Sequence, residues 1–587
     1  MERGDDYFQF GAFRLDPYER VLLRDGRLVP LPAKVLSTLL LLVRNNGRVV
    51  EKDVLMAGVW PDEYVEEGNL AQHIFILRKA LGEGTGSPRY IETVPRRGYR
   101  FAAKMIEPDK KDDDKEIVSL AVLPFVNASN DPKMEYLSDG ITESIMNGLS
   151  HLPQLKVTAR STVFRYKGAG IDPQEAGHSL GVRTVMMGVV QQLGEQLVIS
   201  AELVDVEDGS RIWSESHKRF SDIFSLQDQL AWEISDRLRL RLSGEQKEKL
   251  TKRFTESREA YESYLKGRYH WARRAIGDLK KGIEYFQQAI AEDPNYSLAH
   301  AGIADCLVLL GLFGAADPRT IMPQAKAAAM KAIELDESHG EAYASLGQIK
   351  LIYDWDWPAA EADFQQAILL GSSYPTAHQW HGESLVSAGL FDQGLVELKK
   401  ARDLDPLSLI INTNLGLNFY MARQYDLALE QLERALELEP NFFRAHLHLG
   451  MCYERKRMYA EAIAELEKAR SISENSWTLA ALGHCHASFG ARTEAENFLD
   501  QLLELSQRQY VSCATIAVVY AGFQDRADQT MEWLEKAYEE RSGLLIWLKV
   551  WPIFDHLRSD ARFVRLLRRI GLTISSVRAD SSQQITS

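Results

Sequence analysis

The chain has 587 residues, about four times a typical domain of roughly 150 residues, so its length predicts several separate cores. Hydrophobic residues make up 45% and charged residues 26%, an ordinary globular composition that excludes a mainly disordered or collagen-like chain. The net charge of −14 argues against a nucleic-acid coat protein, but the charge is uneven. Residues 1–105 carry 16 Lys and Arg against 14 Asp and Glu, whereas the rest carries 53 against 69.

Neither a membrane helix nor a secretion signal is visible in the sequence. The longest apolar run near the N-terminus, 35–43, is far shorter than the roughly 20 residues of a membrane helix. The cysteines are far apart and form no C-x-x-C pair, so we expect a cytoplasmic protein without a metal or cofactor. His484-Cys485-His486 is a weak metal candidate, because successive residues of a helix point in different directions. The four cysteines are Cys306, Cys452, Cys485 and Cys513.

Composition and periodicity divide the chain into five stretches. Residues 108–116 contain eight charged residues out of nine and predict a solvated linker. A softer boundary falls near Ser243-Gly244. The expected parts are an N-terminal domain (7–104), the linker (105–116), an α/β domain (117–243), a helical repeat region (255–572) and a disordered tail (573–587).

The N-terminal stretch predicts short strands over 7–31, three helices and a final hairpin. Asp25-Gly26 is a hairpin signal, Pro32 begins the first helix and Gly47 ends it, and Pro61-Asp62 breaks a second helix over 51–59. The third helix, 67–81, has a buried stripe formed by Leu70, Ile74, Leu77 and Leu81. That spacing exposes Asn69, Gln72, His73 and Ile76.

Two strands, 90–94 and 99–101, follow the third helix and flank a turn at Pro95-Arg96-Arg97-Gly98. Residues 69–104 hold seven basic side chains against only Glu83 and Glu92. A helix pair followed by a basic hairpin has the parts of a winged helix, in which one helix enters the major groove and the hairpin reaches phosphates or the minor groove. The seven are Arg78, Lys79, Arg89, Arg96, Arg97, Arg100 and Lys104.

This stretch resembles the OmpR/PhoB family of winged helix-turn-helix domains over nearly all of residues 8–104. The resemblance rests on Leu31–Lys34, Leu70–Ile74, Leu77–Leu81 and Ile91–Phe101. It implies base contacts for Asn69, Gln72, His73 and Ile76, and places Arg78, Lys79, Thr93, Arg96, Arg97 and Tyr99 near phosphates or the adjacent groove. Relatives often have arginine where this chain has Phe75 and Ile76, so their base preference is not inherited. The domain begins within the first ten residues, which predicts no receiver domain and a CadC/ToxR-like arrangement without the membrane helix.

The middle stretch predicts a mixed α/β sandwich. Strands are expected at 117–125, 155–159, 184–193, 197–206 and 211–217, with helices at 134–149, 173–180 and 221–242. It resembles the TolB N-terminal/FlgO-like region of bacterial signalling proteins on Leu120–Phe125, Tyr136–Glu143 and Gly188, which implies a sensory or assembly role. Asp139 and Glu143 could be read as a catalytic pair, but helix capping and dipole complementation are the commoner explanation.

The C-terminal half repeats every 34 residues, the sign of stacked helix pairs. Alanines 332, 367, 401, 435 and 469 share one motif position, Gly382, Gly416 and Gly450 share another, and about nine extra residues near 312–321 predict one longer loop. The pattern matches tetratricopeptide (TPR) repeats, best over 409–476. Such a solenoid is either a spacer or a peptide-binding groove, and Gln379, Arg444 and Arg455 are the polar groove candidates.

The sequence therefore predicts a multidomain fold: an N-terminal winged helix, a central α/β mixed-sheet domain and a C-terminal TPR α-solenoid. It predicts a sequence-specific transcription regulator whose repeats bind a protein partner. Candidate partners are double-stranded DNA, a protein or peptide in the groove, RNA polymerase and further copies of the chain. The alternative is a scaffold or adaptor with non-essential DNA binding. No G-x-x-x-x-G-K-[ST], H-E-x-x-H or G-x-S-x-G motif occurs, which argues against an enzyme.

Overall fold

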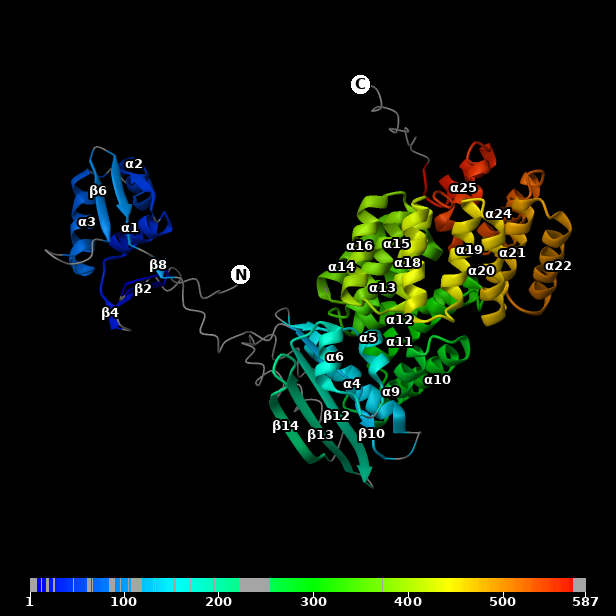
Figure 1. The fold of residues 1–587 in the computed structure, drawn as a ribbon, viewed down its shortest axis with the longest axis horizontal. Coiled ribbons are helices and arrows are strands. Elements are labelled where there is room, and N and C mark those ends of the chain that lie inside the picture. The colour runs from blue at the N-terminus through cyan, green and yellow to red at the C-terminus, as the bar shows by residue number, and fades with distance from the viewer. Residues whose placement is uncertain are drawn as a thin grey trace. The chain divides into compact units, whose positions relative to one another are not determined.

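The described part of the chain divides into two compact units, residues 1–115 and 116–587, and each has its own core (Figure 1). The computed structural model describes residues 8–11, 13–16, 21–24, 27–45, 47–60, 65, 67–83, 90–95, 97–103, 105–106, 119–129, 131, 134–150, 152, 155–168, 170–193, 196–220, 254–371 and 373–573.

The first unit, drawn in blue in Figure 1, contains three helices and two antiparallel sheets. One sheet has the order β4-β3-β2-β1-β8 and the other the order β5-β7-β6. The elements are β1 (Phe8–Phe10), β2 (Phe13–Asp16), β3 (Val21–Arg24), β4 (Arg27–Val29), α1 (Ala33–Arg44), β5 (Val49–Glu51), α2 (Lys52–Val59), α3 (Glu67–Ala80), β6 (Ile91–Val94), β7 (Gly98–Phe101) and β8 (Met105–Ile106).

These elements confirm the predicted winged-helix order. Pro32 precedes α1, and Gly47 follows it with a φ of +76°, a backbone conformation that favours glycine. Arg24 pairs with Arg27, so β3 and β4 form the predicted hairpin around 25–26, although the turn itself lies outside the described residues. The predicted stripe of α3 is buried against Phe10, Phe13 and Phe101, with Leu70 and Leu77 fully inaccessible.

The second unit begins with a mixed sheet of order β11-β9-β12-β13-β14, in which β10 also pairs with β12. β9 runs parallel to β11 and β12, whereas β12, β13 and β14 are antiparallel. The mixed sheet was predicted, but the helix predicted over 221–242 lies outside the described residues. The elements are β9 (Ser119–Val122), β10 (Val126–Asn127), α4 (Glu135–Ser150), β11 (Lys156–Val157), α5 (Arg160–Val163), η2 (Phe164–Tyr166), α6 (Pro173–Leu180), β12 (Thr184–Leu193), β13 (Gln196–Asp205) and β14 (Arg211–Phe220).

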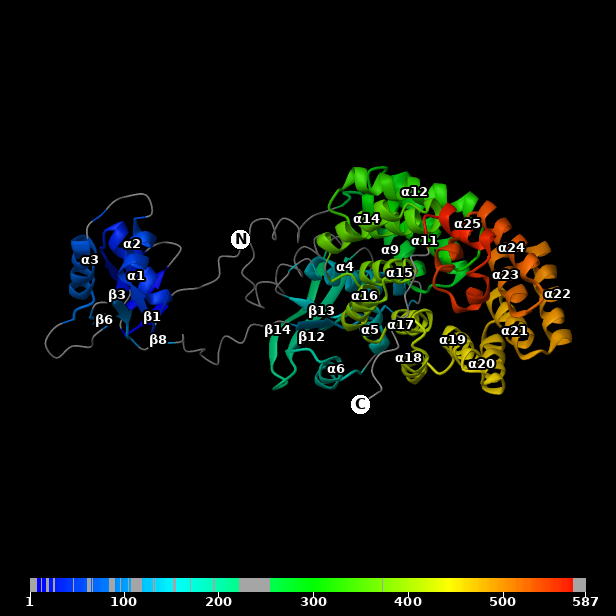
Figure 2. The same ribbon diagram turned by 90° about the horizontal axis from the view of Figure 1, so that it is seen from above.

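Stacked helix pairs make up the remainder of this unit and curve around a concave side (Figure 2). The elements are α9 (Arg258–Ala272), α10 (Ile276–Glu292), α11 (Ser297–Leu312), α12 (Pro318–Leu335), α13 (Gly340–Ile349), η3 (Lys350–Asp354), α14 (Trp357–Leu370), α15 (Pro375–Ser387), α16 (Phe391–Leu404), α17 (Leu409–Met421), α18 (Tyr425–Leu438), α19 (Phe443–Arg455), α20 (Tyr459–Ile472), α21 (Ser476–Phe489), α22 (Arg492–Arg508), α23 (Cys513–Gly522), α24 (Ala527–Glu539), η4 (Gly543–Trp547), η5 (Pro552–Leu557) and α25 (Ala561–Arg569).

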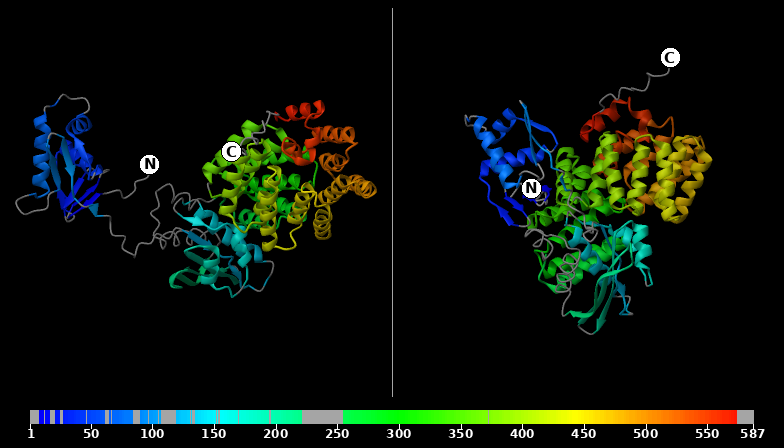
Figure 3. Two further views of the ribbon diagram at one scale, coloured as in Figure 1. Left: turned by 45° about the horizontal axis from the view of Figure 1, so that its top comes forward. Right: turned by 60° about the vertical axis from the view of Figure 1, so that its left-hand side comes forward.

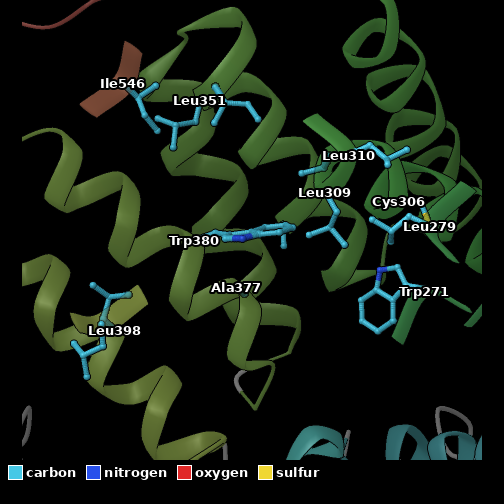
Figure 4. Packing of buried hydrophobic residues seen from close by; sticks show 14 of the residues in the cluster. Trp271, Leu279, Cys306, Leu309, Leu310, Leu351, Ala377, Trp380, Leu398 and Ile546 are labelled. Atoms are coloured by element: carbon cyan, nitrogen blue, oxygen red, sulfur yellow. The ribbon is translucent and has the colours of Figure 1, made fainter. Parts of the chain in front are cut away.

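Small residues bring the two helices of each pair together. A Cβ added to Gly416 would lie 2.7 Å from the Leu432 side chain, and one added to Gly450 would lie 2.5 Å from Leu466. The repeated alanines at 332, 367, 401, 435 and 469 are all fully buried. Figure 4 shows the resulting core, with Trp380, Leu309 and Trp271 in a row across three helices. The small residues therefore recur every 34 positions because one helix must approach the next closely at each of them.

The prediction of one longer loop near 312–321 is wrong. α11 has 16 residues and α12 has 18, against 13 and 14 for α17 and α18, and the connection between α11 and α12 is only 313–317. The apolar segment Leu307–Leu310 continues α11, and Asp317 caps α12 by accepting a hydrogen bond from the Arg319 backbone N–H. Most of the extra residues therefore lengthen the two helices, and the connection is only slightly longer than the 422–424 connection between α17 and α18.

After the last repeats the chain returns along the earlier helices, and the red end of the ribbon lies against the green and yellow helices (Figure 3). Lys549 donates a hydrogen bond to the Ala388 carbonyl at 2.7 Å, and Arg423 donates to Asp555 at 2.7 Å. Arg541 donates to the Tyr353 carbonyl at 3.3 Å. We call residues 541–557 the return segment. It follows the edge of the repeats where α13, α15, α17 and α19 end.

Over the residues that can be described, the search for membrane spans finds no helix both long and apolar enough to cross a bilayer.

Candidate DNA interface and repeat cavity

Helix α3 presents a solvent-facing stripe along the first unit. Asn69, Gln72 and Lys79 are exposed on it, as is Phe75, which is 68% exposed. These positions recur every three or four residues, so they share one face of the helix opposite its buried stripe. The stripe combines two amides, an aromatic ring and a cation.

His73 and Ile76, which the spacing predicted to be exposed, are half-buried instead. The Nδ1 atom of His73 lies 2.9 Å from the Thr38 hydroxyl, and its ring lies 4.7 Å from the Trp60 ring. Burial, followed by the Lys34 charge, lowers the pKa of His73 and favours the neutral ring. Ile76 packs against the core. The partners on α1 lie more than thirty residues away in sequence, so the helical spacing alone could not reveal them.

Arg78 ties α3 to the following hairpin. Its guanidinium donates to the Ile91 carbonyl at 2.9 Å and to the Thr93 hydroxyl at 2.8 Å, and its Nε lies 3.5 Å from Glu83. Glu83 also accepts hydrogen bonds from the backbone N–H groups of Tyr90 and Ile91, both at 2.7 Å. Arg78 and Thr93 therefore hold the hairpin against the helix.

Among the described residues of this region, two basic side chains have no acidic partner. Glu92 accepts a hydrogen bond from Arg100 at 3.0 Å, so the two acidic residues of the basic stretch neutralise Arg78 and Arg100. Within the described residues, the exposed side chains of Lys79 and Arg97 have no hydrogen-bond or ion-pair partner. Arg96, Arg89 and Lys104 lie outside the described residues. Of the basic side chains that the structure describes in this region, Lys79 and Arg97 are thus available to a polyanion.

Tyr99 and Gly98 form the inner side of the hairpin. Tyr99 is only 8% exposed and pairs with Val50 and Thr93 across the sheet. Gly98 packs so closely that an added Cβ would lie 2.0 Å from the Val50 carbonyl oxygen. Tyr99 therefore belongs mainly to the core of the unit, and Gly98 is required for β5 and β7 to approach each other.

In the second unit, α4 is joined to the first repeat through Glu143. Its carboxylate accepts hydrogen bonds from Arg160 at 3.1 Å and from the Nε of Arg268 at 2.7 Å. Glu143 and Arg268 are 6% and 7% exposed. Burial opposes ionisation of Glu143, but the two guanidinium charges outweigh it and lower its pKa. Asp139 binds Lys167 at 2.7 Å. Both carboxylates are ion-paired within the fold, so the predicted capping role is replaced by a structural one.

The α/β part also contacts the repeats farther along. Asp405 accepts a hydrogen bond from Thr162 at 2.6 Å and another from Ser161. Arg165 donates to the Leu438 carbonyl at 2.8 Å. Asp405 and Leu438 lie at the ends of α16 and α18, whereas the return segment contacts the ends of α15 and α17. The chain itself therefore covers both edges of the repeats.

Between these edges lies a cavity of about 1360 Å³, which we call the repeat cavity. Its walls come from α4, α5, the concave helices α9, α15, α17 and α19, and the return segment. Gln379 donates to Glu383 at 2.9 Å, and Asn414 donates to the same carboxyl oxygen at 2.8 Å. Gln379 and Arg444 line the cavity as predicted groove residues would, whereas Arg455 is bound to Glu454 and to the Pro552 carbonyl of the return segment.

The metal candidate His484-Cys485-His486 is packed among the repeats. His484 lies 3.0 Å from Glu454, and Cys485 is fully buried. No cluster of three or more His, Cys, Asp or Glu residues suited to a metal occurs among the residues described.

His448, which is 9% exposed on the cavity wall, should make the fold acid-sensitive. Burial, and then the charge of Arg444, lowers its pKa to about 3, against an opposing backbone hydrogen bond with Thr413. The unfolded chain protonates histidine below about pH 6.5, whereas the folded chain does not until about pH 3, so stability falls as the pH drops through this window.

Between pH 7 and pH 5, His448 should lower the free energy of unfolding by about 2 kcal/mol. Urea unfolding at the two pH values, compared with His448→Asn, measures it. An equal pH dependence in the variant and the parent chain would contradict the assignment.

Comparisons with known proteins place both units. The family model "Transcriptional regulatory protein, C terminal" matches residues 26–101, and the model "Tetratricopeptide repeat" matches residues 413–476. The first match covers the helices and hairpin described above, and the second covers α17 to α20.

Several relatives share part of the chain. "Transcriptional regulator HilA" of Salmonella typhi is 27% identical over 424 residues, which are 70% of this chain and 73% of that protein. "Putative adenylate cyclase 3" of Rhizobium meliloti (strain 1021) is 31% identical over 231 residues, only 39% of either chain. The solved "DNA binding domain of E. coli CadC" is 31% identical, with a TM-score of 0.16, over 17% of this chain and 94% of that one.

The first unit thus carries an OmpR/PhoB-type regulatory domain and the second carries TPR repeats, as the sequence predicted. Over these parts the chain is similar to DNA-binding transcription regulators of OmpR/PhoB type, and it also contains a TPR region.

Proposed function

We propose that the chain recognises specific duplex sequences by inserting α3 into the major groove while the β6–β7 hairpin reaches the backbone. The observation that carries this proposal is the exposed stripe of α3 beside two unpaired cations. Amide side chains pair with adenine edges, and an aromatic ring can contact the thymine methyl group. Asn69, Gln72 and Phe75 would therefore read bases, while Lys79 and Arg97 would bind phosphates.

The other predicted contacts serve this interface indirectly. His73 and Ile76 fix α3 on the core, and Arg78 with Thr93 fixes the hairpin on α3. Tyr99 supports the hairpin from below. Arg96 lies outside the described residues, and its contact with a phosphate stays a prediction.

We further propose that the repeat region binds a partner and thereby gates, recruits or multimerises the DNA-binding unit. TPR repeats supply concave surfaces that suit this role. Gln379 and Arg444 on the cavity wall support the proposal, whereas Arg455 is already bound within the chain. Protein partners, including RNA polymerase or further copies of this chain, would contact the repeats around this side.

A gel shift with the full-length chain tests DNA binding. Changing Arg96 and Arg97 together to alanine should weaken binding to all duplexes and reduce the slope of log affinity against log salt by about 1 for each lost phosphate contact. Gln72→Ala should instead change which sequences are preferred, with a discrimination loss of about 1–3 kcal/mol. Undiminished binding by the arginine variant would remove the hairpin from the interface. If the parent chain shifts no duplex even in dilute salt, the scaffold alternative replaces this proposal.

A further inference from the structure

The repeat cavity holds charged and polar donors that the protein leaves without acceptors. Arg444 lies 5.0 Å above the Phe313 ring, and Arg274 lies 3.9 Å above the Trp271 ring. Within the described residues, neither guanidinium has a hydrogen-bond or ion-pair partner. Trp271 and Trp551 also line the cavity, and their buried indole nitrogens have no hydrogen-bond acceptor among the described residues.

These donors contrast with the neighbouring arginines that the fold satisfies. Arg160 and Arg268 share Glu143, and Arg165 donates to a carbonyl oxygen. Burial lowers the pKa values of Arg274 and Arg444, since the charges nearby do not compensate for the water they lose. A guanidinium that has lost water and has no hydrogen-bond acceptor lowers the stability of the fold, unless a bound molecule supplies the acceptor.

Two of the acidic groups on the wall, Glu383 and Asp405, are already held by other side chains and are poor substitutes for that acceptor. Glu383, whose charge acts on Arg444, is held by the amides of Gln379 and Asn414, and burial raises its pKa. Asp405 is held by Ser161 and Thr162, and burial raises its pKa as well. The arginines on the wall thus lack acceptors, because these two nearby carboxyl groups already bind other side chains.

Apolar and aromatic side chains make up a further part of the wall. Trp380 reaches from α15 toward Leu309, with Trp271 beyond (Figure 4). Leu447 and Met451 of α19 continue the surface. A volume of about 1360 Å³ is somewhat above the roughly 300–1,000 Å³ common for small-molecule sites. The α/β part and the return segment cover the two edges, which favours a compact occupant over a long extended peptide.

We propose that the partner of the repeat cavity is a small organic oxyanion, a carboxylate or phosphate attached to an aromatic or aliphatic body. Arg444 binds the oxyanion, and the tryptophan and leucine side chains bury the body. This inference rests on the proposed function of the repeats as the partner-binding part, and it assigns the cavity a small ligand in addition to the protein partners proposed for the surrounding surface.

Calorimetric titration of the full-length chain tests the inference. The probes are 4-phenylbutyrate, octanoate and octyl phosphate, with 4-phenylbutanol, 1-octanol and inorganic phosphate as controls. At least one anionic probe should bind at least ten-fold more tightly than its neutral counterpart and than inorganic phosphate. The probe that binds best distinguishes carboxylate from phosphate and aromatic from aliphatic bodies. Equal binding of neutral and anionic probes, or no binding of any anion, overturns the inference.

Arg444→Gln supplies the matched test of the site. Because a charge-assisted hydrogen bond contributes about 1.5–3 kcal/mol, the variant should bind the anion roughly 10- to 100-fold more weakly. Arg434→Gln, at an arginine 57% exposed on α18, should bind like the parent chain. Arg444 has no hydrogen-bond or ion-pair partner among the described residues, so the variant should unfold at the parent's temperature or above it. A variant that binds as the parent does would contradict the site.

The gel shift separates this inference from the proposed function. If no anion binds but duplex DNA is still retarded, only the anion inference fails. If a peptide rather than the anions binds and Arg444→Gln weakens it, the cavity is a peptide site and the inference is wrong. If duplex DNA is not retarded, the regulatory proposal fails whatever the cavity binds.

Discussion

Replacing Glu143 by glutamine is expected to lower the free energy of unfolding of the second unit by about 3–5 kcal/mol. The change removes the carboxylate charge that Arg160 and Arg268 share, and leaves the buried Arg268 with only the longer ion pair to Glu341 at 3.7 Å. Because α4 is joined to α9 through this group, both the sheet and the first repeat should be affected. Urea unfolding followed by tryptophan fluorescence measures the loss.

Glu383→Gln is the matched control for this prediction. Glu383 also lies on the cavity wall, but amides rather than cations hold it, and burial raises its pKa. Its neutral substitute should therefore change stability by no more than about 1 kcal/mol. Equal losses for the two variants would show that the substitution itself, and not the ion pairs of Glu143, causes the effect.

The pH dependence of the Glu143 variant follows from the same ion pairs. Because the two arginines lower the pKa of Glu143 in the folded chain, its stabilising contribution is present above the unfolded value near 4.5 and is lost as the pH falls through the lower folded value. The difference between parent and variant should therefore shrink in acid.

Gly98→Ala is expected to destabilise the first unit by about 3 kcal/mol and to abolish the shift of duplex DNA. The added Cβ would lie 2.0 Å from the Val50 carbonyl oxygen and 2.9 Å from the Glu51 Cα, and both are backbone atoms that cannot rotate away. β5 and β7 must then separate, which displaces the hairpin that Arg78 holds on α3. Scanning calorimetry and the gel shift measure the two effects.

Gly68→Ala provides the control within the same unit. Nothing lies within 4 Å of a Cβ added to Gly68, and the residue is in the first turn of α3. Alanine there should stabilise the helix by about 0.5–1 kcal/mol. The unfolding of residues 116–587 should not change in either variant, since that unit has its own core. Retention of the parent melting temperature by Gly98→Ala would refute the close-packing argument.

Helices whose ends and buried faces follow from nearby residues could be predicted from the sequence. Pro32, Gly47 and the apolar stripe of α3 predicted three helices, and the spacing of alanines and glycines predicted the repeats. α5 and η2 were missed because runs of three and four residues carry no measurable periodicity. The resemblance of the α/β part to the TolB N-terminal/FlgO-like region, and the proposed domain limits, stay predictions.

The site could be predicted only where exposure follows from position along one helix. Asn69 and Gln72 are exposed as expected, but His73 turns toward Thr38 and Arg78 toward Thr93. Both partners come from other elements, so no pattern within α3 encodes them. For the same reason the repeat cavity and the return segment, which join residues more than one hundred positions apart, left no local signal.

In an ordinary solenoid each unit touches only its neighbours, so the array can fray one unit at a time and flex like a spring. Here Lys549, Arg423 and Arg455 connect the return segment to three successive concave helices. The return segment thus crosses the ends of several concave helices and links them to one another. Loss of the return segment would loosen the middle of the repeat array as well as its end. With the segment in place, the array should resist bending as one stiff body.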